Sequence, residues 1–227
     1  MWLDYFGNRL NFQTPKLCFD QKSKVLLNSS IPTFDTLHFQ ITAMAGAGQK
    51  GHLWLLRVLE QVLAYPDSQQ THLRPIELSF IGLEQGPYAA FTREVIRRGQ
   101  TLLGDSFHWT HHGSQFDALC AMARANLSVS CSLAETFSLV SAESMALGQP
   151  LLRSQTGGWS EQLDTGVNGF DLGPPGPEVR QQHIDLFYRL RDPEIFSNEH
   201  LMQMSQAAKA KALEFSSVNY STWLLNT

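Results

Sequence analysis

The chain has 227 residues and is 43% hydrophobic, which suffices for one large α/β domain or two small ones of an ordinary globular protein. Charged residues make up 17%, the formal net charge is -4, and no basic stripe is present, so a nucleic-acid partner is not expected. No stretch has the apolar length of a membrane-spanning helix and no secretory signal opens the sequence, so the expected compartment is the cytoplasm, with contact at a membrane surface left open.

Residues 1–35 are expected to form an entry segment in front of the main domain. KVLLN (24–28) could form one strand, but a segment of this length is too short to build its own hydrophobic core. We therefore interpret residues 1–35 as an entry segment or the remnant of another domain with its linker, and residues 36–227 as the main domain.

From residue 36 onward, short apolar runs alternate with helical patterns. The expected strands are 37–43, 76–82, 106–110, 127–132, 151–154 and 169–172. The helices expected between them are 55–62, 88–98, 116–126, 139–147 and 159–163. Such alternation is typical of a parallel sheet with crossover helices. The sequence therefore predicts an α/β, Rossmann-like, doubly wound sheet of about six parallel strands.

The turn-rich stretch GPPGPE (173–178) ends the alternation, and helical patterns follow it. These patterns cover 183–192, 198–215 and 217–226, and no further strand is indicated. We expect the C-terminal helices to close the edge of the sheet.

GAGQKG (46–51) has the G-x-G-x-x-G spacing of a dinucleotide-binding loop and lies between a strand and a helix. That interpretation requires an acidic residue about 20 positions further on, whereas the next strand ends about 30 positions on and the nearest acid there is Glu84. A Walker loop is excluded because His52, and not a lysine, follows the last glycine. An ordinary turn with a solvated Lys50 is an equally good explanation of the loop at this point.

A short helix is predicted after the strand 127–132. Ser138 suits its N-cap, and Gly148, followed by Gln149-Pro150, suits its end, so the helix should cover 139–147. Its start lies at the carboxyl end of the strand, which is where open α/β sheets bind ligands.

Two carboxylates flank this helix start. Glu135 lies in the loop before the helix, and the backbone amides of Phe137, Ser138 and Leu139 are unpaired donors that, with the helix dipole, favour an anion such as a diphosphate. Glu143 lies one turn into the helix and suits neutral hydroxyls, since a carboxylate only accepts hydrogen bonds. A nucleotide sugar has this layout, with a sugar at one end and a ribose at the other. The plain alternative is that Glu135 caps backbone amides and Glu143 is a solvated helix residue.

The stretch 133–172, LAETFSLVSAESMALGQPLLRSQTGGWSEQLDTGVNGFDL, resembles nearly position by position the signature of the retaining GT-B glycosyltransferases of the glycosyl transferase group 1 family (family 4). Its elements keep the family's order: a strand, Glu135 and Glu143 with seven residues between them, a second strand, Gly157-Gly158 with Glu161, and Asn168-Gly169. Upstream, Lys50-Gly51, FIGLEQGPY (80–88) and KVLLNSSIP (24–32) resemble the family's lysine-glycine pair, its glycine-proline turn and its interdomain linker.

The resemblance implies a nucleotide diphosphate sugar as donor. It places Glu143 on the ribose, the amides of Phe137, Ser138 and Leu139 on phosphate or sugar, and Lys50 on the diphosphate. Lys50 would neutralise the charge that develops as the nucleotide diphosphate leaves, and Glu135 would orient the sugar and stabilise positive charge at its anomeric carbon. Glu135 and Lys50 are thus the implied catalytic residues, and neither a metal nor another cofactor is needed.

Two departures qualify the resemblance. Ala45 stands where the family usually has an arginine, five residues before the lysine, so one of two phosphate cations is missing. Only about 35 residues precede the donor domain, so the acceptor-binding half is not expected in this chain, and both reactants must meet in one cleft for catalysis. The predicted function is the donor-binding half of a glycosyltransferase with an unidentified acceptor. The alternative is a non-catalytic nucleotide-sugar-binding module that acts with a separate acceptor-binding domain or chain.

HWTHH (108–112) contains three histidines, but strand alternation puts His111 on the opposite face from His108 and His112. A metal site is therefore not predicted there. We expect these histidines at a polar strand end near the nucleotide base.

Overall fold

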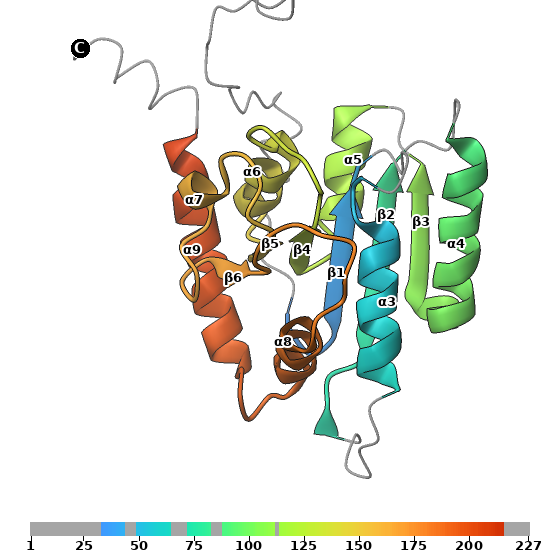
Figure 1. Cartoon of the computed structure of the whole chain (residues 1–227). Helices are drawn as coiled ribbons and strands as arrows, with labels where there is room; N and C mark the ends of the chain where they lie inside the picture. The colour runs from blue at the N-terminus through green and yellow to red at the C-terminus, as the bar shows by residue number, and fades with distance from the viewer. Residues whose placement is uncertain (1–32, 44–48, 65–71, 83–87, 112–113, 216–227) are drawn as a thin grey trace, which may run out of the picture.

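The computed structural model describes residues 33–43, 49–64, 72–82, 88–111 and 114–215 (Figure 1). Several expectations concern residues outside these ranges, namely those on 1–32, Ala45, the glycines of 46–48, Glu84, His112 and 217–226. Within the described part, helices flank both faces of one sheet.

The sheet has six parallel strands in the order β3-β2-β1-β4-β5-β6. Their bounds are β1 Leu37–Thr42, β2 Ile76–Gly82, β3 Phe107–His111, β4 Leu127–Ser130, β5 Leu151–Arg153 and β6 Gly169–Asp171. The predicted doubly wound, Rossmann-like sheet is confirmed. The strand order reverses between β1 and β4, and in open α/β sheets such a switch point leaves a crevice at the carboxyl ends of the strands.

The helices occupy the connections that the sequence predicts. They are α3 His52–Leu63, α4 Ala89–Leu103, α5 Gln115–Met122, α6 Leu139–Ala146, α7 Trp159–Gln162, α8 Gln181–Arg191 and α9 Asn198–Glu214, with a 3-10 turn η2 at Gly104–Ser106.

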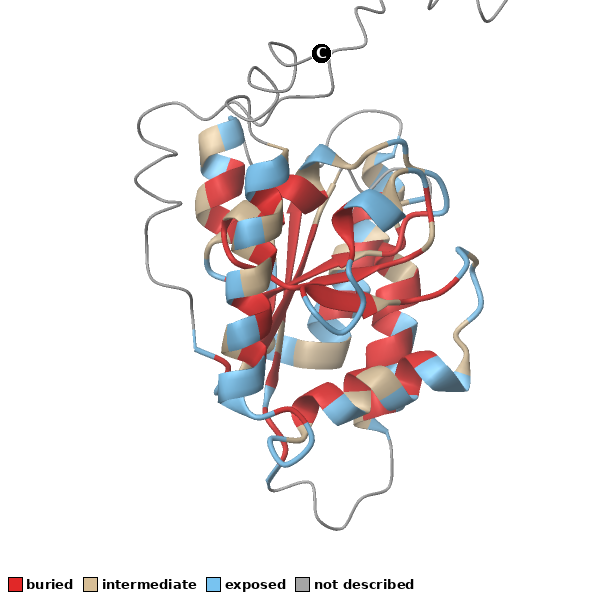
Figure 2. Ribbon diagram, turned by 90° about the vertical axis from the view of Figure 1, so that its left-hand side faces the viewer, coloured by how far each residue is buried: buried red, intermediate tan, exposed pale blue. Residues whose placement is uncertain are grey.

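β1 lies inside the sheet and is buried on both faces, as Figure 2 shows by the almost wholly red strands. Leu37, Phe39 and Ile41 belong to the main hydrophobic core, to which α3, α4 and α8 contribute. His38 and Gln40 alternate with them and face the side on which α5 and α6 pack. Burial on both faces is typical of parallel sheets.

Gln40 joins β1 to the elements that carry the site. Its side chain is fully buried, and Nε2 lies 3.0 Å from Ser128 Oγ in β4, 2.9 Å from Ser144 Oγ in α6 and 3.1 Å from Gln149 Oε1. Thr42 Oγ1 donates to Gln40 Oε1 at 2.6 Å. Because a buried amide is stable only when it is hydrogen-bonded, this cluster fixes β4 and α6 relative to β1.

The C-terminal helices differ in what they cover. α8 packs against α3, and its Phe187 contacts Phe39 of β1 with 5.1 Å between ring centroids. α9 packs against α6 on the β6 side of the sheet (Figure 1). The expectation that these helices close the sheet's edge therefore fits α9 but not α8, whose apolar residues are used on a face. In the described ranges no helix combines the length and the apolar character needed to span a bilayer.

Candidate functional site

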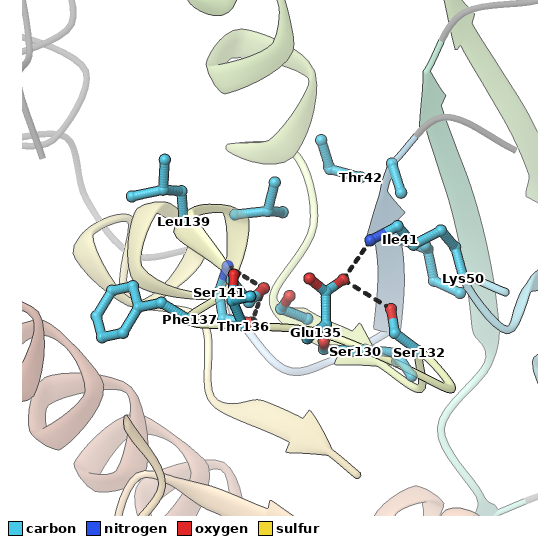
Figure 3. Close-up of a pocket in the computed structure, with 15 residues that line it drawn as sticks. Ile41, Thr42, Lys50, Ser130, Ser132, Glu135, Thr136, Phe137, Leu139 and Ser141 are labelled. Atoms are coloured by element: carbon cyan, nitrogen blue, oxygen red, sulfur yellow. Dashed lines mark hydrogen bonds and ion pairs between the residues drawn. The ribbon is translucent and has the colours of Figure 1, made fainter. Parts of the chain in front are cut away.

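A cavity of about 390 Å³ opens at the carboxyl ends of β1 and β4, where the strand order reverses (Figure 3). Its lining consists of residues 41–43, 50, 128–130, 132 and 135–141. This volume is in the range of small-molecule sites, and the location is where open α/β sheets bind ligands.

The loop after β4 enters α6 through a capped and strained residue. Ser138 has φ 61°, and its hydroxyl accepts a hydrogen bond from the Ser141 amide at 3.4 Å. Of the non-glycine residues described, Ser138 alone has positive φ. α6 ends before Gly148, which has φ 83°. The predicted N-cap and the glycine at the helix end are thus confirmed.

The backbone carbonyls of residues 136–138 are all held by groups that do not line the cavity. Each carbonyl accepts at least one hydrogen bond from the segment that follows β5 or from β5 itself. The bonds run from Gly158 N to Thr136 O at 2.6 Å, from both Arg153 Nη atoms to Phe137 O at 3.4 Å, and from Gln162 Nε2 to Ser138 O at 3.2 Å. These bonds fix the peptide planes at the start of α6.

The amides of Phe137, Ser138 and Leu139 have no acceptor within the described residues. All three residues line the cavity, and they lie at the positive end of the α6 dipole. The Phe137 ring itself packs on Phe215, 5.1 Å away between centroids. Three unpaired amides beside an open cavity form a site for an anion.

Gly157 packs closely against the backbone of the loop after β4. It has φ 54°, and a Cβ at this position would overlap the carbonyl oxygens of Thr136 and Glu135. Only glycine combines that backbone conformation with so close an approach. The glycine pair of the sequence therefore has a structural role, which is to let the turn after β5 pack against the loop after β4.

Arg153 is a fully buried guanidinium behind the loop. It donates to the carbonyls of Phe137 and Thr156, the latter at 3.1 Å, and its Nε has no partner in the described part of the chain. Burial lowers the pKa of Arg153 to about 10, against the opposing effect of Glu135 and Glu161, so it is charged at neutral pH. Sequence reasoning missed Arg153, although a charged residue inside the apolar strand LLRS was a signal for it.

Lys50 and Glu135 meet across the cavity. Lys50 Nζ forms an ion pair with Glu135 Oε1, which also accepts a hydrogen bond from Ser132 Oγ at 2.9 Å (Figure 3). Gly51, with φ 80°, turns the chain into α3, and a Cβ there would overlap Cys131. The loops after β1 and β4 are therefore in direct contact, and this contact brings together a lysine and a carboxylate 85 positions apart.

Glu143 lies on the same rim but outside the cavity lining. Its Oε1 accepts a hydrogen bond at 2.6 Å from Gln115 Nε2, at the start of α5. Burial raises the pKa of Glu143, and the Gln115 hydrogen bond opposes this shift. The carboxylate is thus partly desolvated. The structure brings five of the six predicted site residues to one cavity, and Glu143 to a contact between α5 and α6.

His108 is not near this site. It is the second residue of β3, so it lies at the amino end of the strand, whereas the cavity lies at the carboxyl ends of β1 and β4. The expectation that it lies near a nucleotide base is therefore wrong for His108. The sequence predicted that His111 lies on the opposite face of this strand from His108, and the three positions that separate them in β3 agree with that.

Comparison with protein-family models matches residues 48–211 to the family described as "Glycosyl transferases group 1". This match includes Lys50 and the whole loop after β4. Comparison with curated protein sequences gives no match.

Several solved structures have a similar fold. A glycosyltransferase from Rickettsia africae ESF-5 superposes with a TM-score of 0.62 at 18% identity, over 90% of this chain and 50% of that one. Anabaena HepE in complex with UDP-glucose superposes with a TM-score of 0.61 at 19% identity, over 91% of this chain and 50% of that one. Sucrose-phosphate synthase from Thermosynechococcus elongatus superposes with a TM-score of 0.62 at 17% identity, over 91% of this chain and 47% of that one. The chain thus spans about half the length of these structures, and at such identities the likeness establishes the fold.

Proposed function

The chain belongs to the glycosyl transferases group 1 family, and on this premise we propose that it is the donor-binding half of a retaining GT-B glycosyltransferase. In this proposal it holds a nucleotide diphosphate sugar whose sugar is passed to an acceptor bound by another domain or chain. The group 1 match and the location of the cavity at the switch point of the sheet both support it.

The observation that carries the proposal is the set of unpaired amides at residues 137–139. Their carbonyl neighbours are held from behind, so the amides are preorganised and need no rearrangement to receive an anion. Arg153 adds a buried positive charge on the far side of the same peptide groups. A diphosphate, which carries several acceptor oxygens and negative charge, satisfies both features.

Lys50 and Glu135 take complementary roles in this proposal. The two side chains form an ion pair with each other, so a bound diphosphate competes with Glu135 for the ammonium group. Lys50 then neutralises the charge on the leaving nucleotide diphosphate. Glu135 turns to the hydroxyls of the donor sugar and stabilises positive charge at its anomeric carbon.

Glu143 is proposed to hold the ribose. Gln115 is its one hydrogen-bond donor in the described residues, so its carboxylate keeps acceptor capacity for two hydroxyls. Its partial desolvation strengthens such bonds. Anabaena HepE, a structural neighbour, was solved with UDP-glucose, which supports a UDP-sugar as the first donor to test.

The test is calorimetric titration of the full chain with UDP-, GDP- and ADP-sugars, repeated with Glu143→Ala and with Glu94→Ala as control. Glu94 is an exposed glutamate of α4 that pairs with two arginines away from the cavity. We expect one donor to bind the wild type, and Glu143→Ala to weaken it about 10-fold to 100-fold, because hydrogen bonds to a charged acceptor are lost.

Glu94→Ala should bind like the wild type. If no nucleotide sugar binds the wild type, the donor site is wrong. If the wild type binds but Glu143→Ala binds equally well, the ribose role of Glu143 is wrong and the amide site stands.

A non-catalytic binding module remains the second candidate, and one observation favours it. Ala45 stands where the family usually has an arginine, so one of the two cations expected at the diphosphate is missing from the sequence. Both candidates predict donor binding. They differ in whether sugar is transferred when an acceptor-binding domain is supplied.

A further inference from the structure

A second group of polar side chains lies at the amino ends of β1, β2 and β3, whereas the donor-site cavity lies at the carboxyl ends of β1 and β4. His38 pairs in register with Glu77, and Ser79 pairs with His108. Because side chains two residues apart share a face of a strand, all four project from the same face. They line one cavity of about 500 Å³ with Ala121 and Arg124 near the end of α5.

Three of these side chains present ligand atoms to one point. Glu77 Oε2 lies 3.5 Å from His38 Nδ1 and 3.6 Å from His108 Nε2, and all three candidate atoms lie within 4.8 Å of one another. Tetrahedral zinc with bonds of about 2.0–2.1 Å places neighbouring ligand atoms about 3.3 Å apart. The side chains therefore need to shift little to surround an ion.

The fourth side chain orients a ligand. His38 Nε2 lies 2.7 Å from Ser79 Oγ, and the His38 residue is 8% exposed. When Nε2 carries the proton and donates it to the hydroxyl, the lone pair of Nδ1 points at Glu77. Histidines that bind metals generally donate their second ring N–H to such a partner.

From this arrangement we propose that His38 Nδ1, Glu77 and His108 Nε2 bind a divalent transition-metal ion of the zinc class. Two imidazoles and one carboxylate, with water as a fourth ligand, form a donor set that suits zinc. The ion would join the amino ends of three adjacent strands, independently of the donor site.

The charges around the cavity largely favour a cation. Glu77 carries the one carboxylate of the lining, and the nearby C-terminal end of α5 contributes the negative end of its dipole. The Arg124 guanidinium opposes the ion, but this side chain is exposed and can turn to solvent.

Zinc titration of the full chain tests the site, with His108→Ala and Glu77→Gln as variants and His111→Ala as the matched control. His111 is an exposed histidine of the same strand on its other face. We expect one Zn²⁺ per chain in the wild type and in His111→Ala. Each of the two site variants should bind at least about 10-fold more weakly, and Ser79→Ala about 10-fold more weakly.

Cobalt titration of the wild type provides a readout that does not depend on the folding of any variant. Intense visible absorption of a four-coordinate Co²⁺, displaced by Zn²⁺, is the expected result. Equal zinc affinity in the wild type, His108→Ala and Glu77→Gln would overturn the proposal. A loss of zinc affinity in His111→Ala as large as that in the site variants would also overturn it, and so would a wild-type spectrum that shows only the weak absorption of six-coordinate Co²⁺.

Discussion

His52 is a buried ionisable residue next to the loop that carries Lys50. It follows Gly51 as the first residue of α3, is 1% exposed and packs edge-on against Phe80, with centroids 4.8 Å apart. Neither of its ring nitrogens has a partner in the described residues. Burial, followed by the positive charge of Lys50, lowers the pKa of His52 to about 4. The neutral ring thus fills the core beneath the loop that carries Lys50.

This pKa predicts a loss of stability in acid. The unfolded chain takes up a proton on His52 near pH 6.5, whereas the folded chain does so only near pH 4, so unfolding is favoured as the pH falls between these values. The difference corresponds to about 3 kcal/mol. Denaturant unfolding at a series of pH values measures how steeply the free energy of unfolding depends on pH. We expect this dependence between pH 4 and 6.5 to be weaker in His52→Leu than in the wild type, and unchanged in His111→Leu. An unaltered slope in His52→Leu would show that other groups cause the acid sensitivity.

Individual site residues differ in how far the sequence predicts them. Ser138 and Glu135 were placed correctly because a strand end, a capping residue and a helix follow one another in the chain. Arg153 was missed because its role depends on a contact between the segments after β4 and β5, which no local pattern records. The roles of Lys50 and Glu143 stay predictions.

At the scale of elements, the candidate site depends on a helix that contributes nothing to the cavity lining. α9 packs against α6 through Ala208 and Ala212, which share a hydrophobic cluster with Ala142 and Met145. Ser205 Oγ donates to the Gly148 carbonyl at the end of α6. Since α6 has only eight residues, its position is set by such packing more than by its own helical stability.

Charge placed in this contact should therefore affect ligand binding from a distance. Ala208→Glu buries an unpaired carboxylate between α9 and α6, and we expect it to lower the free energy of unfolding by about 3 kcal/mol and to weaken nucleotide-sugar binding. Ala210→Glu on the exposed side of α9 is the matched control and should leave both quantities near the wild type. Chemical unfolding and calorimetry measure the two effects. Wild-type stability in Ala208→Glu would contradict the described packing.

The bounds of helices and strands were predictable where the apolar periodicity agrees with the capping or turn residues at the two ends. β2 was predicted over 76–82 and occupies Ile76–Gly82, and α6 was predicted over 139–147 and occupies Leu139–Ala146. The location of α8 was not predictable. A helical pattern shows that one side of a helix is buried, but not whether it packs on a face or at an edge of the sheet.

At the scale of the whole molecule, strand order decides where the site is. The alternation of strands and helices predicted a parallel doubly wound sheet, but the reversal between β1 and β4 emerges only from long-range pairing. The same holds for the trio His38, Glu77 and His108, whose members come from three different strands. Sequence reasoning considered only the histidines of HWTHH (108–112) and predicted no metal site there.

The chain as a whole should bind donor without transferring its sugar. A UDP-sugar at about 100 times its dissociation constant is expected to raise the melting temperature by about 5–10 °C, because it binds only the folded state. Sugar transfer should be undetectable with the chain alone and should appear when an acceptor-binding domain is added. Transfer by the chain alone would contradict this prediction. Donor binding without transfer, whatever domain is supplied, would favour the non-catalytic module.

The ion pair between Lys50 and Glu135 has a consequence for selectivity. Because Lys50 and Glu135 neutralise each other, a simple anion such as sulfate that captures the ammonium group leaves the Glu135 carboxylate without its cationic partner. A molecule that carries phosphate and hydroxyl groups together compensates both residues at once. If the proposed function is right, the ion pair favours binding of a complete nucleotide sugar over binding of either of its parts.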